Sequence, residues 1–151
     1  MLDALPPDFF SNCFRLIVAT LLAVPIAWDR ERRGKIMGLR TYPLIAISSC
    51  GFILLGNSVL ASSQDDAQAR LLQGLMTGIG FLGAGALTRR DDDDRGEGTA
   101  TAASVWTTGV IGASVALERY EIALALSALN FAVLRLGTVF KSRLEDLRSD
   151  D

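Results

Sequence analysis

Two short segments hold the carboxylate and guanidinium side chains that are best placed to do chemistry. In residues 29–41 the charged or conformationally special residues are Asp29, Arg30, Glu31, Gly38, Arg40 and Thr41. The second segment is the run of adjacent carboxylates Asp91–Asp94. Such charges can pair with one another, hold a cation or attract an anionic partner.

The first segment joins both signs of charge to a glycine and a hydroxyl residue. We expect Asp29 or Glu31 to pair with Arg40 and fix a turn, and the Thr41 hydroxyl to cap the helix that follows. Surface ion pairs contribute only about 0–1 kcal/mol, so this use is structural. Because basic residues also attract anionic lipid head groups, a partner or ligand site is the alternative.

The run of four aspartates is less suited than the first segment to form a defined binding site. Mg²⁺ prefers oxygen ligands, but it usually keeps several waters and uses one or two carboxylates. Runs of like charge are more often solvated. We therefore expect Asp91–Asp94 to be solvated, with loose cation association as the alternative.

The sequence lacks the residue types on which most catalytic mechanisms depend. The sequence has no histidine, which removes imidazole ligands and His-based acid–base catalysis. Cys13 and Cys50 show no disulfide or metal-ligand spacing and are expected to act as small apolar residues. Without a nucleophile–base pair or a phosphate loop, we expect no enzyme activity, no cofactor, no metal site and no nucleic-acid partner.

Five long apolar runs must position these segments. They are Phe9–Trp28, Tyr42–Leu60, Leu71–Thr88, Ala100–Leu117 and Ile122–Phe140. About 20 helical residues cross the roughly 30 Å hydrocarbon core of a bilayer, and a soluble chain of 151 residues has no interior for five such helices. The sequence predicts an all-α, multi-pass membrane protein: a bundle of five transmembrane helices over residues 1–140 and a short cytoplasmic tail over 141–151.

Lysine and arginine give this bundle a predicted orientation, because they are enriched in cytoplasmic loops. One side carries Arg30, Arg32, Arg33, Lys35, Arg40, Arg89, Arg90, Arg95, Lys141, Arg143 and Arg148, and the other carries Arg70 and Arg119. The bias predicts an N-terminus outside and a C-terminus in the cytoplasm.

Arg15 and Arg135 are the two remaining basic residues, and both lie inside apolar runs. We expect their long side chains to reach the membrane interface. Structural ion pairs are the alternative, with Asp8 for Arg15 and with Asp29 or Glu31 for Arg135.

Small residues predict where the helices approach closely. In the third run Gly74, Gly78 and Gly85 share one face, with Gly80 and Gly83 near the opposite side. This pattern predicts a central helix wedged between neighbours, with a glycine-lined solute path as the alternative.

The fourth run has a hydroxyl face and one deep aromatic residue. Thr101, Ser104, Thr108 and Gly112 share a face that can hydrogen-bond across a helix interface. Trp106 is expected to pack against another helix. Trp28, Tyr42 and Tyr120 stand where interfacial aromatic residues are expected.

Three segments resemble the MgtC/SapB family of bacterial inner-membrane proteins. Residues 29–41 read DRERRGKIMGLRT and resemble the family's ERExxGKxxGLRT; residues 78–85 match its GIGFLGAG; residues 98–106 are similar to its GLTTAASLW. Asp29 stands where the family usually has Glu, and the Asp91–Asp94 insert lengthens a loop. Longer relatives append a soluble C-terminal domain for which we expect no counterpart here.

The resemblance implies a multi-pass inner (plasma) membrane protein that supports survival under magnesium limitation or acid stress. Some members of the family bind other membrane machines, including the proton-translocating ATP synthase. The partners expected by resemblance are therefore the lipid bilayer, a membrane protein of this kind and a second copy of the chain.

Two functions remain open from the sequence. The preferred hypothesis is a non-enzymatic regulatory protein that docks small-residue helices against a partner; the alternative is a passive conduit for Mg²⁺ or another small solute beside Gly78–Gly85. A lipid-sensing structural protein rests only on the basic first loop. The candidate contact residues are Asp29, Arg30, Glu31, Gly38, Arg40, Thr41, Gly78, Gly80, Gly83, Gly85, Thr101, Ser104 and Trp106.

Overall fold

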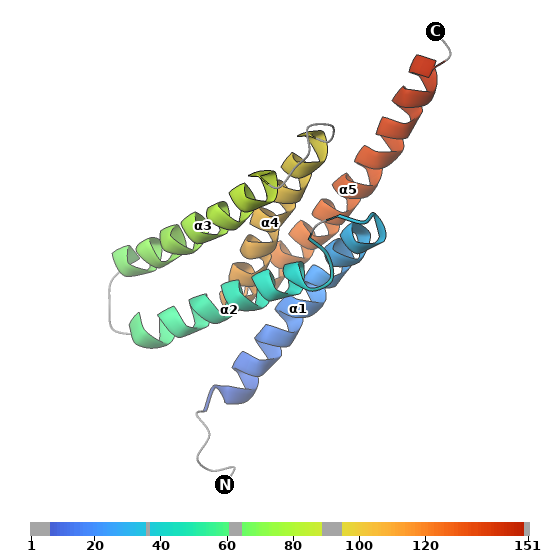
Figure 1. Cartoon of the computed structure of the whole chain (residues 1–151). Coiled ribbons are helices and arrows are strands. Elements are labelled where there is room, and N and C mark those ends of the chain that lie inside the picture. Colours follow the sequence, from blue (N-terminus) through green and yellow to red (C-terminus); the bar gives the residue numbers. More distant parts are fainter. Residues whose placement is uncertain (1–6, 36, 61–64, 89–94, 150–151) are drawn as a thin grey trace.

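The described part of the chain forms five α-helices (Figure 1). The computed structural model describes residues 7–35, 37–60, 65–88 and 95–149. The helices are α1 (Phe9–Arg32), α2 (Thr41–Leu60), α3 (Asp65–Thr88), α4 (Arg95–Ala116) and α5 (Tyr120–Ser149). The predicted all-α class is confirmed.

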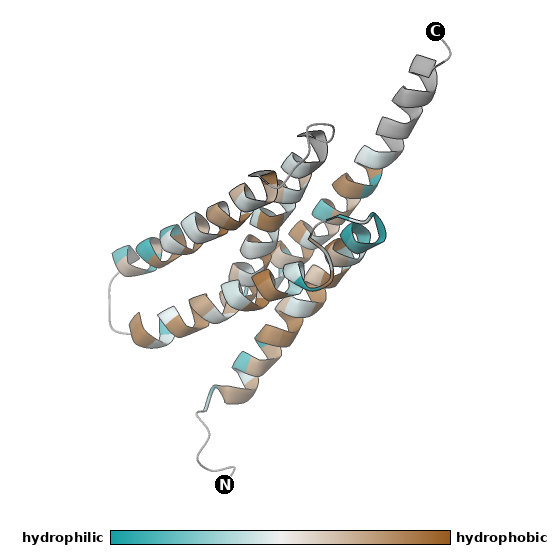
Figure 2. Ribbon diagram, in the orientation of Figure 1, coloured by the Kyte–Doolittle hydropathy of each residue, from teal (hydrophilic) through white to brown (hydrophobic). Residues whose placement is uncertain are grey.

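Three of the described helices are long and apolar enough to cross a membrane: α1, α2 and residues 120–138 of α5. Their outer surfaces carry exposed large apolar side chains, such as Phe10 (71% exposed), Leu55 (65%) and Val133 (67%). Brown, hydrophobic residues dominate these helices in Figure 2, and teal ones gather at the turn between α1 and α2. A surface of this kind suits lipid rather than water. The five-span topology and its orientation stay predictions.

The central helix of the bundle is α4, which contacts all four others. In the described part of the chain α3 contacts only α2 and α4, so it lies at the edge of the bundle. The prediction of a wedged α3 is therefore wrong. Small residues do mark the close approaches, and the closest backbone approach is at Gly112 of α4.

Gly112 shows why α4 takes the centre. A Cβ at this position would overlap the carbonyl oxygen of Ala46 on α2 and lie 2.9 Å from the Cβ of Ser49. Because the obstacle is backbone rather than the flexible end of a side chain, α2 cannot yield locally. Glycine thus allows the two backbones to cross in contact.

The exposure of four aromatic residues bears on their predicted positions. Trp28 and Tyr120 are 48% and 37% exposed, and their interfacial position stays a prediction. Tyr42 is wholly buried within the chain, so its prediction is wrong. Trp106 was expected to pack against another helix, but 48% of its side chain is exposed on α4.

Arg15 forms an ion pair that the sequence did not single out. Its guanidinium pairs with Glu118 in the α4–α5 turn and lies 3.5 Å from the carbonyl oxygen of Ala116. Glu118 has a φ of 60°, a left-handed conformation that is common where a helix ends. The predicted alternative of an ion pair is therefore met, but with Glu118 rather than Asp8.

The α2–α4 crossing gives a first testable prediction. Gly112→Ala is expected to lower the free energy of unfolding by about 1–3 kcal/mol, because the added methyl forces the two backbones apart. Gly137→Ala is the matched control, since a Cβ there meets no atom within 4 Å. Alanine is the better helix former, so the control should be neutral or slightly stabilising. Thermal unfolding in one detergent measures both, and equal melting temperatures would contradict the close crossing.

Candidate functional site

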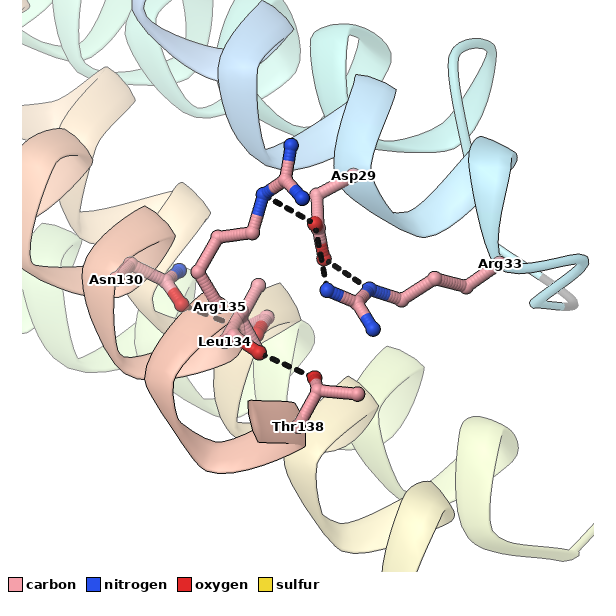
Figure 3. Close-up of polar contacts among 7 residues, drawn as sticks. Asp29, Arg33, Asn130, Leu134, Arg135 and Thr138 are labelled. Carbon is pink, nitrogen blue, oxygen red and sulfur yellow. Dashed lines mark hydrogen bonds and ion pairs between the residues drawn. The ribbon is translucent and has the colours of Figure 1, made fainter. Parts of the chain in front are cut away.

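Asp29 is the centre of the charged segment that the sequence singled out. It lies near the end of α1 and is only 2% exposed. Its carboxylate accepts hydrogen bonds from the Nε and Nη2 of Arg33 at 2.9 and 3.2 Å, and it pairs with the Nε of Arg135 on α5 at 3.2 Å (Figure 3). One carboxylate therefore joins the end of α1 to α5 through charge-assisted contacts.

The predicted alternative for Arg135, an ion pair with Asp29, is confirmed. Its side chain is half-exposed, and its guanidinium also lies 5.5 Å from the centroid of the Phe131 ring. The long side chain thus reaches along α5 to the end of α1. Through this ion pair with Asp29, Arg135 connects α5 to the end of α1.

Arg30 adds a second buried charge beside this pair. It is 5% exposed and lies near both Asp29 and Tyr42. Within the described residues its Nε has no hydrogen-bond partner, and neither does the Tyr42 hydroxyl, which lies close to Ser104. Unsatisfied buried groups of this kind are where ordered water or a ligand is expected.

Glu31 and Gly38 form the turn between α1 and α2. The Oε2 of Glu31 accepts a hydrogen bond from the backbone N–H of Leu39 at 3.0 Å. A Cβ on Gly38 would overlap the same carboxylate, so a larger residue there would displace the Glu31 side chain from this bond. The carbonyl of Gly38 then accepts from the N–H groups of Thr41 and Tyr42, at 3.0 and 3.3 Å, where α2 begins.

The turn is therefore fixed differently from the prediction. The carboxylate of Glu31 binds backbone rather than Arg40, and Asp29 binds Arg33 and Arg135. Among the described residues the Thr41 hydroxyl makes no hydrogen bond, so the capping prediction is wrong as well. Arg40 is exposed, and no described residue pairs with it.

Polar contacts continue from this turn into the helices. The hydroxyl of Ser104 on α4 donates to the Oδ1 of Asn130 on α5 at 3.1 Å. The hydroxyl of Ser127 on α5 donates to the carbonyl oxygen of Leu22 on α1 at 2.7 Å. These bonds tie α1, α4 and α5 together in surroundings that are otherwise apolar.

The structure brings only part of the predicted set together. Asp29, Arg30, Glu31 and Gly38 share the turn, and Ser104 lies beside them through Tyr42. Thr101 is buried on α4, and a Cβ added to Gly83 would lie 3.5 Å from the carbonyl oxygen of Ala102, an ordinary contact distance. Arg40 and Thr41 lie beside the groove between α2 and α3, and Trp106 is exposed on α4. The acidic run Asp91–Asp94 lies outside the described residues.

The other predicted glycines of α3 leave open space where a side chain would be. A Cβ added to Gly74, Gly78, Gly80 or Gly85 would meet no atom within 4 Å. Gly74 and Gly78 lie beside α2, where they line a groove between the two helices, and Gly80 is exposed on another side of α3.

Two signals could have found the residues that the sequence reading missed. Arg33 stands four residues after Asp29, the spacing at which side chains meet on a helix. Asn130 is a lone amide in an apolar run, where a polar side chain usually has a partner. Nothing in the sequence distinguished Tyr42 from an interfacial tyrosine.

The geometry of the charged turn suits bracing better than catalysis or metal binding. Its one buried carboxylate is occupied by two guanidinium groups. Across the residues that the structure describes, no group of three or more His, Cys, Asp or Glu side chains gathers to hold a metal. What remains available is positive charge at the surface, on Arg40 and the exposed Arg32.

Comparison with known proteins agrees with the family motifs. Residues 16–143 match the model of the MgtC family. The chain is 34% identical to Protein SrpB of Synechococcus elongatus over 128 residues, covering 78% of this chain and 69% of that protein. It is 33% identical to the putative magnesium transporter YhiD of Escherichia coli K12 over 127 residues (81% and 58%). No solved structure matches.

A third relative is Protein MgtC of Salmonella typhimurium, at 34% identity over 116 residues, or 77% of this chain and 48% of that protein. The matched region thus spans about half to two-thirds of the length of these curated relatives. The match covers both the charged turn and the glycine-rich helix. On this basis the chain belongs to the MgtC family of membrane proteins.

Proposed function

We propose that this chain is a non-enzymatic regulatory protein of the bacterial inner membrane, which docks α3 against a helix of a partner membrane complex. The observation that carries the proposal is an exposed stripe of small residues on α3: Thr77, Gly80 and Ala84. At about 100° per residue these positions share one face. A Cβ on Gly80 would meet nothing within 4 Å, so a second helix can reach the backbone there.

Membrane helices associate through packing rather than hydrophobic burial, because lipid tails are as apolar as leucine. Small residues at four-residue spacing, as at Gly80 and Ala84, let two backbones approach and gain van der Waals contact. The position of α3 at the edge of the bundle leaves this stripe accessible. We refer to Thr77, Gly80 and Ala84 as the α3 stripe.

The partner is proposed from the family resemblance. It is a membrane machine such as the proton-translocating ATP synthase, engaged under magnesium limitation or acid stress, with a second copy of this chain as the competing occupant. The ion pairs of Asp29 with Arg33 and Arg135 support this role, because they hold α1 and α5 together in the bundle at whose edge α3 lies.

A passive conduit for Mg²⁺ is the second candidate, and the name of the relative YhiD, a putative magnesium transporter, favours it. Mg²⁺ needs oxygen ligands along its path. Asp29 is the one buried carboxylate in the described part of the chain, and it is held by Arg33 and Arg135. Gly78 lines an open groove between α2 and α3, and Gly80 is exposed on another side of α3, so an enclosed glycine-lined path would need a second molecule.

The docking proposal predicts the effect of filling the α3 stripe. Gly80→Leu is expected to reduce recovery of a cross-linked partner from native membranes about tenfold, because a bulky side chain at a close crossing costs roughly 1–3 kcal/mol. Gly137→Leu is the control: it adds the same side chain to an equally open site on α5. Unchanged recovery with Gly80→Leu, in cells limited for Mg²⁺, would refute docking through this stripe.

The ion pairs of Asp29 with Arg33 and Arg135 predict an effect on the stability of the fold. Asp29→Asn is expected to lower the free energy of unfolding by about 2–3 kcal/mol, less than for a fully buried pair because Arg135 is half-exposed. Glu118→Gln is the control and should cost under about 1 kcal/mol, since the carboxylate of Glu118 is 63% exposed. Chemical unfolding in detergent measures both losses.

Reconstituted liposomes complete the comparison. A docking protein leaves them tight to Mg²⁺, as reported by an enclosed Mg²⁺-sensitive dye. A flux through the wild-type chain that Asp29→Asn abolishes, at a temperature where the variant is still folded, would make Asp29 a transport ligand and favour the conduit.

A further inference from the structure

We infer that the groove between α2 and α3 binds an anionic phospholipid, with an acyl chain along the groove and the phosphate against Arg40. The groove has a volume of about 570 Å³, within the range of ligand sites in proteins. It lies on the side of α3 opposite the α3 stripe. The inference stands apart from the docking proposal, because it needs no partner protein.

The groove lies beyond the place where α2 and α3 touch, and glycines on α3 leave it open. Near their connection a Cβ on Gly56 of α2 would run into the side chain of Leu71 on α3, so the helices touch there. Farther along, Gly74 and Gly78 face the groove without side chains, and a Cβ on either meets nothing within 4 Å. In Figure 1 α2 and α3 lie side by side.

The length of the groove favours a lipid over a helix. Its α2 wall runs from Thr41 to Phe52, which at about 1.5 Å per residue is roughly 17 Å. Half of a hydrocarbon core of about 30 Å is roughly 15 Å, so the groove is as deep as one leaflet. An acyl chain spans one leaflet, whereas a transmembrane partner helix would extend well beyond the groove.

The charge of the groove favours an anionic head group. Among the described residues its walls are apolar or hydroxyl side chains, including Leu44, Phe52 and Leu82, and the one charged residue is Arg40 at the end. No described residue pairs with Arg40, because Asp29 is held by Arg33 and Arg135 and Glu31 accepts from Leu39. Basic pockets between membrane helices on the cytoplasmic side recognise anionic lipid heads, and this is the predicted cytoplasmic end.

Native mass spectrometry of the purified full chain in detergent tests the inference. The chain is titrated with phosphatidylglycerol and with phosphatidylcholine that carries identical acyl chains. We expect phosphatidylglycerol to bind about fivefold more tightly, the effect of one arginine near a membrane surface. Arg40→Gln should remove this difference, while Arg119→Gln, which changes an exposed arginine in the α4–α5 turn, should keep it.

A second pair of variants tests the place of the acyl chain. Gly78→Leu fills the groove and should lose binding of both lipids, whereas Gly80→Leu, on the other side of α3, should keep it. Circular dichroism checks that both variants remain helical. Equal binding of the two lipids to the wild-type chain would overturn the inference. Retained binding in Gly78→Leu, or a change in oligomeric state alone, would do so as well.

Discussion

A carboxylate removed from water must be neutralised, and much of this fold follows from how Asp29 meets that requirement. The loss of hydration costs several kcal/mol, which only close, well-directed partners offset. Arg33 supplies one partner from the residue after α1, and Arg135 supplies the other from α5. The helix end, the turn and the last helix are therefore fixed together. The bond from Leu39 to Glu31, and the absence of a side chain on Gly38, complete the same turn.

Hydropathy and charge predicted the five helices and located the charged turn between the first two, because both signals are local. The partners within the turn were harder to predict. Asp29 and Glu31 were expected to pair with Arg40, yet Arg33 and a backbone N–H lie closer to them. Tyr42 was placed at the membrane interface, since a tyrosine at the end of an apolar run looks the same whether its helix face meets lipid or protein. Its burial depends on how α2 is turned against α1 and α4, which the sequence does not state.

The glycines illustrate the same limit on reading packing from sequence. The pattern in α3 and the pattern in α4 both predict close approach, and both were read as interior. In the structure Gly112 of α4 lies against the backbone of α2, whereas Gly80 of α3 faces open surroundings. Composition thus tells where a neighbour can come near. Whether that neighbour belongs to this chain or to another molecule depends on the arrangement of the helices.

The groove and the α3 stripe lie on the same helix, so a change at one can affect the other. In the described part of the chain α3 contacts only α2 and α4, and the groove leaves part of its α2 side without protein contact. A helix supported along only part of its length takes its tilt from whatever fills the remaining gap, because close packing transmits displacement. A lipid chain beside Gly74 and Gly78 would therefore also set the direction in which Gly80 and Ala84 face. Lipid binding and docking would then be coupled through one rigid helix, with no contact between the two ligands.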